Sequence, residues 1–97
     1  MGCKVIFAPQ AIARLAEIVR AVAKDKPDVA VRFGLHLIEH TQLLENFPEL
    51  GAPYRKRRNV RRLWCKPYFI YYRVKRQQGV VGVLDFWHSA KQEPEFP

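Results

Sequence analysis

Lysine and arginine side chains cluster in one part of this 97-residue sequence. Residues 50–79 contain ten Lys and Arg and no Asp or Glu, whereas residues 1–49 are neutral overall and residues 80–97 are slightly acidic. Such clustering destabilises a fold through self-repulsion, so it favours a binding site for an anionic partner over a merely solvated surface. Most of these residues are arginines, and a guanidinium group can donate two parallel hydrogen bonds to a phosphate or a carboxylate.

The densest part of the cluster is residues 55–62, and aromatic residues lie beside it. Basic side chains bind nucleic-acid backbones, and exposed rings stack on unpaired bases, so we expect this surface to bind an anionic macromolecule. Packing between strands is the commoner role of such rings, and it stays open here. The possible stacking rings are Tyr54, Trp64, Tyr71 and Trp87. The predicted target-binding residues are Arg55, Lys56, Arg57, Arg58, Arg61, Arg62, Trp64, Tyr71 and Arg73.

A few of the same residues could cleave RNA. Cleavage requires removal of the ribose 2′-hydroxyl proton, stabilisation of the charge that develops on phosphorus, and protonation of the leaving oxygen. His88 could act as the acid or base, with Arg62 and Arg73 as charge stabilisers, if the sheet brings all three to one concave face. The alternative is that His88 simply ends a strand at the surface.

Metal binding and disulfide formation are not expected. His36 and His40 are four residues apart and share a helical face, but the HExxH pattern is missing and no third ligand is evident in the sequence. Cys3 and Cys65 form no CxxC pair and are interpreted as free thiols. We therefore expect neither a metal nor another cofactor.

The first half of the chain predicts a strand and two helices. Residues 5–7 are a short apolar run, and apolar residues recur at helical spacing over residues 9–24 and again over residues 27–46. The short turn between the helices makes them an antiparallel hairpin. The second helix is apolar on one face and also on a flank formed by Val31, Leu35 and Ile38. We expect burial on two sides, and the alternative is an exposed patch for another chain.

The second half predicts three antiparallel strands, at residues 60–65, 68–74 and 80–87, joined by hairpin-length turns. The predicted fold is α+β, with a two-helix antiparallel hairpin packed on a small, mainly antiparallel sheet in β-α-α-β-β-β order. In the middle strand Tyr68 and Ile70 should face the helices, while Phe69 and Tyr71 should lie on an open face.

Composition indicates one globular domain spanning residues 1–97, with an extended or mobile tail at residues 88–97. The chain is 48% hydrophobic and 27% charged, as in ordinary folded proteins. No apolar run is long enough to cross a bilayer, and the first residues do not resemble an export signal, so we expect a cytoplasmic protein.

Four segments then carry a resemblance to a known family. The helical hairpin is followed by NFPELG at residues 46–51, VRRL at 60–63, PYFIYYRV at 67–74 and HSAK at 88–91. In this order they resemble the RelE/ParE superfamily of bacterial toxins, over nearly the whole chain. The resemblance implies the toxin half of a type II toxin-antitoxin pair, a class that stabilises plasmids or arrests growth and is neutralised by a cognate antitoxin.

Two activities occur in that superfamily, namely mRNA cleavage in the ribosome by RelE-like members and inhibition of DNA gyrase by ParE-like members, which are not enzymes. Arg62 matches a basic position of the RelE-like pattern. Phe69, Phe96 and Val60 stand where that pattern has functional groups. We therefore favour gyrase inhibition, with a metal-independent endoribonuclease as the alternative and a small nucleic-acid-binding accessory protein as a third possibility.

An antitoxin would cover the basic sheet and part of the apolar helical surface, and it should be acidic where it makes contact. A homodimer, or a hetero-oligomer with the antitoxin, is compatible with this resemblance. The predicted antitoxin-binding residues are Phe33, Leu37, Arg61, Arg73 and Trp87.

Overall fold

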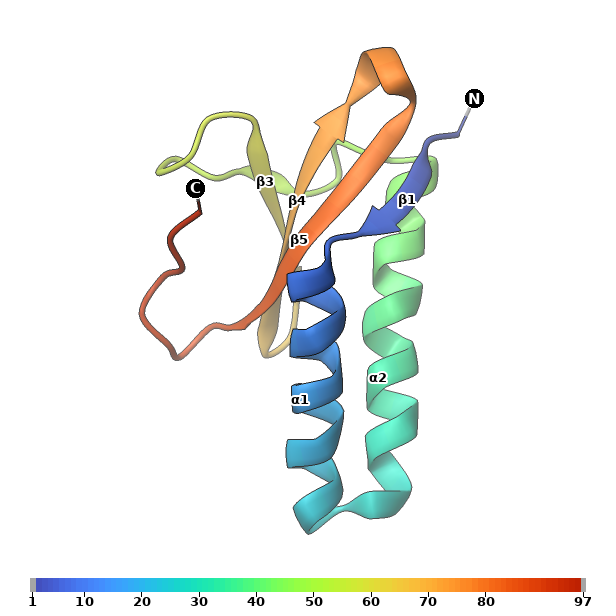
Figure 1. Cartoon of the computed structure of the whole chain (residues 1–97), viewed down its shortest axis with the longest axis vertical. Helices are drawn as coiled ribbons and strands as arrows, with labels where there is room; N and C mark the ends of the chain where they lie inside the picture. The colour runs from blue at the N-terminus through green and yellow to red at the C-terminus, as the bar shows by residue number, and fades with distance from the viewer. Residues whose placement is uncertain (1, 97) are drawn as a thin grey trace.

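The computed structural model describes residues 2–96, which form two α-helices and a five-stranded sheet (Figure 1). The elements are β1 (Lys4–Phe7), α1 (Pro9–Asp25), α2 (Pro27–Gln42), β2 (Ala52–Pro53), β3 (Val60–Cys65), β4 (Tyr68–Lys75) and β5 (Val80–His88). Short 3-10 turns follow α2 and β4. The predicted α+β fold and the element order are therefore confirmed, with the two-residue strand β2 added.

The helices form the predicted hairpin. Each helix has a proline in its first turn, Pro9 in α1 and Pro27 in α2. Backbone N–H groups in the first turn have no acceptor within the helix, so the proline costs no helical hydrogen bond. Lys26 ends α1 by donating its backbone N–H to the Val22 carbonyl, and it also precedes the first turn of α2. Within residues 2–96, neither helix combines the length and apolarity that crossing a membrane would require.

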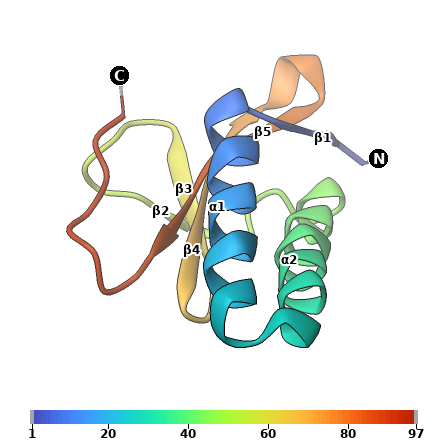
Figure 2. The ribbon, with the colours of Figure 1, turned by 60° about the horizontal axis from the view of Figure 1, so that its bottom comes forward.

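The sheet has the strand order β1-β5-β4-β3-β2. β1 pairs with β5 in parallel, and the other neighbouring pairs are antiparallel. Both helices lie on one side of the sheet, and the chain end returns on the other side (Figure 2). The core on the helix side contains the fully buried Leu37, Ile70, Tyr72 and Phe86.

The second face of the sheet is covered around Tyr71, which corrects the prediction that this residue lies on an open face. Tyr71 is only 1% exposed, because the rings of Tyr54 and Phe96 lie 5.0 and 5.2 Å from its own ring. The Tyr54 hydroxyl donates a hydrogen bond to the Pro94 carbonyl at 3.4 Å. After the turn at residues 89–91, the chain therefore packs against the sheet through Pro94 and Phe96.

The apolar flank of α2 is exposed at two of its three residues, although burial on two sides was expected, and the third, Ile38, is half-buried. Val31 and Leu35 are 64% and 53% exposed. The two helices approach closely at Gly34, where an added Cβ would lie 2.8 Å from the Val19 side chain. α1 and the sheet therefore bury one continuous face of α2, and its flank is left to solvent.

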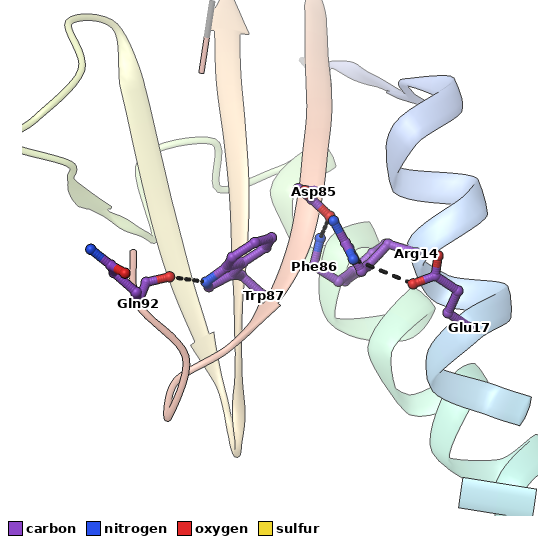
Figure 3. Close-up of polar contacts among 6 residues, drawn as sticks. All are labelled: Arg14, Glu17, Asp85, Phe86, Trp87 and Gln92. Atoms are coloured by element: carbon purple, nitrogen blue, oxygen red, sulfur yellow. Dashed lines mark hydrogen bonds and ion pairs between the residues drawn. The ribbon is translucent and has the colours of Figure 1, made fainter. Parts of the chain in front are cut away.

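A buried ion pair joins α1 to β5 (Figure 3). Asp85 is 4% exposed and lies at an irregularity in β5, where the pairing with β4 shifts between Tyr71 and Tyr72. Arg14 Nε donates to Asp85 Oδ1 at 3.1 Å, and the Phe86 N–H donates to the same oxygen at 2.8 Å. The hydrogen bond to Asp85 raises the pKa of the Arg14 guanidinium, which therefore stays charged.

Replacing Arg14 by methionine should lower the free energy of unfolding by about 2–3 kcal/mol, since it leaves the Asp85 carboxylate buried without its cation. The expected loss lies below that of a fully buried pair because the Arg14 side chain is 22% exposed. The matched control is Glu17→Gln, which removes the exposed partner of the same arginine and should change stability by less than about 1 kcal/mol. Urea unfolding of both variants measures the difference, and equal losses would contradict the role given to Asp85.

Candidate functional site

The basic loop, residues 54–59, presents the densest charge of the chain. Its start is fixed by Tyr54, which is buried and donates its backbone N–H to the Val60 carbonyl at 2.8 Å. Its end is fixed by Asn59, whose φ of 64° is a left-handed conformation that asparagine tolerates well. Arg55, Lys56 and Arg58 are exposed between these points. The local structure therefore holds the backbone and turns the cations outward.

A shallow hollow of about 490 Å³ lies beside this loop. Its basic lining residues are Arg55, Arg57, Arg58, Arg61 and Arg76. Arg76 also forms an ion pair with Glu49. An adjoining hollow is lined by Arg73 and Lys75 together with the far side of the loop. Guanidinium groups converging from two strands and a loop suit an extended anion such as a nucleic-acid backbone.

Arg62 lies at the centre of an intramolecular cluster on the second face. Its guanidinium carbon is 4.2 Å from the Phe69 ring centroid, and Nη1 lies 3.3 Å from the Glu93 carboxylate in the tail. Lys56 contacts the other Glu93 oxygen at 2.5 Å. The hydrogen bond from Lys56 lowers the pKa of Glu93, and the same bond raises the pKa of Lys56. The tail thus supplies a carboxylate that pairs with Lys56 and Arg62 within the chain.

Of the four rings considered for base stacking, the structure leaves Trp64 the most open. It is 48% exposed and lies 4.9 Å from the Phe69 ring. Tyr54 and Tyr71 are buried, so the prediction that Tyr71 binds the target is wrong for this structure. Trp87 is half-buried, and its Nε1–H donates to the Gln92 carbonyl at 2.8 Å (Figure 3).

The structure does not bring the three candidate catalytic residues together. Arg62 pairs with Tyr71 and Arg73 pairs with Val60, so both arginines lie on the second face. His88 pairs with Tyr68, whose side chain packs against the helix-side core, and the rings of His88 and Tyr68 are 5.1 Å apart. RNA cleavage by these three residues would require them on one face of the sheet, and the structure places His88 on the opposite face from the two arginines.

The residues proposed for antitoxin binding differ in accessibility. Leu37 is 0% exposed and belongs to the core, so the prediction that it is a contact residue is wrong. Phe33 and Trp87 are half-buried, and Phe33 lies 5.8 Å from the Tyr68 ring. Arg61 Nη1 donates to the Gly51 carbonyl at 2.7 Å, so this arginine is also used within the fold. Arg73 keeps a partly exposed side chain in the adjoining hollow.

Two features of the site were not predicted from the sequence. Glu93 pairs with Lys56 and Arg62, and its signal in the sequence was an acidic residue in a tail that was expected to be extended or mobile. Cys65 joins His36 and His40 in a group whose possible ligand atoms lie within 4.8 Å of one another. Cys65 comes from β3 and the two histidines from α2, so their proximity could not be seen in the sequence.

Comparison with known families agrees with this architecture. The family model described as the ParE toxin of the type II toxin-antitoxin system, parDE, matches residues 5–93. The chain belongs to this family. A search of curated proteins returned no match for the ParE-family chain.

Two solved structures share the fold. The chromosomal ParDE TA system from P. aeruginosa is similar with a TM-score of 0.79 and 20% identity, covering 89% of this ParE-family chain and 95% of the other. The toxin-antitoxin complex RelBE2 from Mycobacterium tuberculosis is similar with a TM-score of 0.68 and 20% identity, covering 91% and 99%. The RelE/ParE resemblance noted in the sequence is thus confirmed.

Removing the tail carboxylate should strengthen anion binding. We expect Glu93→Gln to elute from heparin at higher salt, because it frees Lys56 and Arg62 as well as removing one negative charge. Glu95→Gln is the matched control, since it makes the same charge change two residues away at an exposed carboxylate.

The elution shift should be clearly larger for the position 93 variant. The difference in elution between Glu93→Gln and the native protein should also shrink as the pH falls through the lowered pKa of Glu93. Below that pKa the native carboxyl group is neutral, as glutamine is. Equal shifts for the two variants at neutral pH would show that the tail carboxylate does not restrain the cluster.

Proposed function

We propose that this ParE-family chain is the growth-arresting toxin of a type II toxin-antitoxin pair, and that it inhibits DNA gyrase in the cytoplasm without cleaving RNA. The observation that carries the proposal is the separation of His88 from Arg62 and Arg73 on opposite faces of the sheet. Acid-base cleavage of RNA requires these groups within reach of one phosphate, whereas blocking a large enzyme requires only a complementary surface.

The exposed cations of the basic loop are the proposed contact with gyrase or with the DNA beside it. Arg55 and Arg58 point outward and line the basic hollow, and the exposed Lys56 between them pairs with Glu93. Trp64 adds an exposed ring on the second face. Charged, exposed groups of this kind increase the rate and specificity of association with an anionic partner.

The proposed regulator is an antitoxin with an acidic contact segment. Support comes from the two similar structures, which are described as a ParDE TA system and a RelBE2 toxin-antitoxin complex. Further support is the position of Glu93, since a carboxylate fits between Lys56 and Arg62 within the chain itself. An antitoxin carboxylate could pair with the same two cations after displacing the tail.

A paired assay tests this function. Purified protein should inhibit DNA supercoiling by gyrase and should leave mRNA intact on translating ribosomes. His88→Gln should inhibit gyrase as the native protein does, because His88 faces the helices. Ribosome-dependent cleavage that disappears in His88→Gln or Arg62→Gln, with gyrase unaffected, would establish the RelE-like alternative instead.

Neutralising the loop should weaken gyrase inhibition. We expect the triple variant R55Q/K56Q/R58Q to need at least about tenfold more protein for half-inhibition, since loss of three charge-assisted contacts costs more than 1.4 kcal/mol. The control is R20Q/K24Q/K26Q, which removes the same charge near the turn between the helices, at the other end of the molecule (Figure 1). Equal losses in both variants would mean that net charge alone matters.

The basic hollow also supports a second candidate, a nucleic-acid-binding accessory protein. If about six phosphates are neutralised, log affinity for duplex DNA should fall with log salt at a slope of about −5. Fluorescence anisotropy with a short duplex measures this slope. A slope near zero would remove the accessory role, and a steep slope without gyrase inhibition would favour it.

A further inference from the structure

Three side chains of types that commonly bind transition metals lie close together between α2 and the end of β3. They are His36 and His40 on α2 and Cys65 at the last position of β3, and their possible ligand atoms all lie within 4.8 Å of one another. His36 is exposed, His40 is half-buried, and Cys65 is only 3% exposed. The group therefore spans the distance from the core to the surface.

The packing of the core fixes this arrangement. The two histidines are four residues apart, so they share one helical face, and their ring centroids are 5.2 Å apart. Cys65 alternates with the exposed Trp64 along β3, and this alternation turns its thiol toward the helices. One turn before His36, Phe33 packs on Tyr68, which pairs with Cys65 across the hairpin. Rigid elements rather than loops thus position all three ligands.

We propose that His36, His40 and Cys65 bind one Zn²⁺ ion through two imidazole nitrogens and one thiolate. A mixed nitrogen and sulfur set suits this borderline-soft ion, and three protein ligands leave a fourth tetrahedral position open. Zinc lies about 2.0–2.3 Å from such ligands, so neighbouring ligand atoms in a tetrahedron are about 3.3–3.7 Å apart. The ligand atoms, which lie within 4.8 Å of one another, would therefore have to approach by about 1 Å to reach this spacing.

Burial favours the neutral form of two of these ligands, which helps metal binding at His40 and opposes it at Cys65. Burial, together with the neighbouring His36, lowers the pKa of His40, which is therefore a neutral imidazole with a free lone pair at neutral pH. Burial raises the pKa of the Cys65 thiol, so zinc has to displace its proton. Binding should therefore release a proton and become tighter as the pH rises.

The bound ion would tie α2 to the β3–β4 hairpin. β3 also carries Arg61 and Arg62, so the metal would stiffen the strand that presents the basic cluster. Because His36 is exposed, the open coordination position would be accessible from solvent. Water, or a histidine, cysteine or carboxylate of another chain, could complete the coordination there.

The test uses the full chain, treated with a chelator and kept reduced, and titrated with ZnCl₂ by calorimetry and by thermal unfolding. We expect saturable 1:1 binding and a higher Tm with zinc, while MgCl₂ has no such effect. Co²⁺ should give a thiolate-to-metal charge-transfer band. His36→Gln changes only an exposed ligand, so it should fold normally and weaken zinc binding at least about tenfold.

Matched controls separate this site from adventitious binding. Cys65→Ser should abolish the cobalt band, whereas Cys3→Ser should keep it, and His88→Gln should bind zinc like the native chain. Absence of 1:1 binding would overturn the proposal, as would unchanged affinity in His36→Gln or a band lost with Cys3 instead of Cys65. If Cys65→Ser fails to fold, His36→Gln with the calorimetric readout still decides.

Discussion

The ion pair between Arg14 and Asp85 connects the layers of this protein. β1 pairs with β5 only from Val80 to Val83. Asp85 lies beyond the end of β1, so the side chain of Arg14 on α1 can reach it there. A carboxylate buried there needs a cation, and this requirement fixes how α1 sits on β5. The Arg14 guanidinium also lies 4.9 Å from the ring of Trp87, which holds the tail through Gln92. Through these two contacts, Arg14 links α1 to the sheet and to the returning chain end.

The returning tail divides the basic residues into two groups. Arg62 and Lys56 contact the Glu93 carboxylate, and Tyr54 and Tyr71 are buried under the same segment. Arg55 and Arg58 remain outside this cover and face solvent. An external anion therefore meets the loop first, and it reaches Arg62 only by displacing the tail. The exposed ion pairs of Glu93 contribute little to holding the tail, whereas the packing of Phe96 on Tyr71 contributes more, so displacement of the tail has to offset that packing.

The periodicity of the sequence was sufficient to predict the elements and the inward side of β4, because alternation directly reports which residues share a face. It could not predict that Tyr71 is buried, since covering that face depends on where a tail without periodicity returns. The convergence of Cys65 with His36 and His40 was equally hidden, because the ligands come from elements that only tertiary packing brings together. The two-residue strand β2 contains a proline and carries almost no signal of its own.

The position of His88 follows from one irregularity in β5. Val81 and Val83 face the helices, so strict alternation would place His88 on the opposite face, which is the face that carries Arg62. The pairing with β4 instead shifts between Tyr71 and Tyr72, which inserts one residue and reverses the alternation beyond Leu84. Phe86 accordingly enters the helix-side core, and His88 follows it to the same side. A one-residue bulge therefore places the histidine on the opposite face from the arginines, and the proposed non-enzymatic function rests on this arrangement.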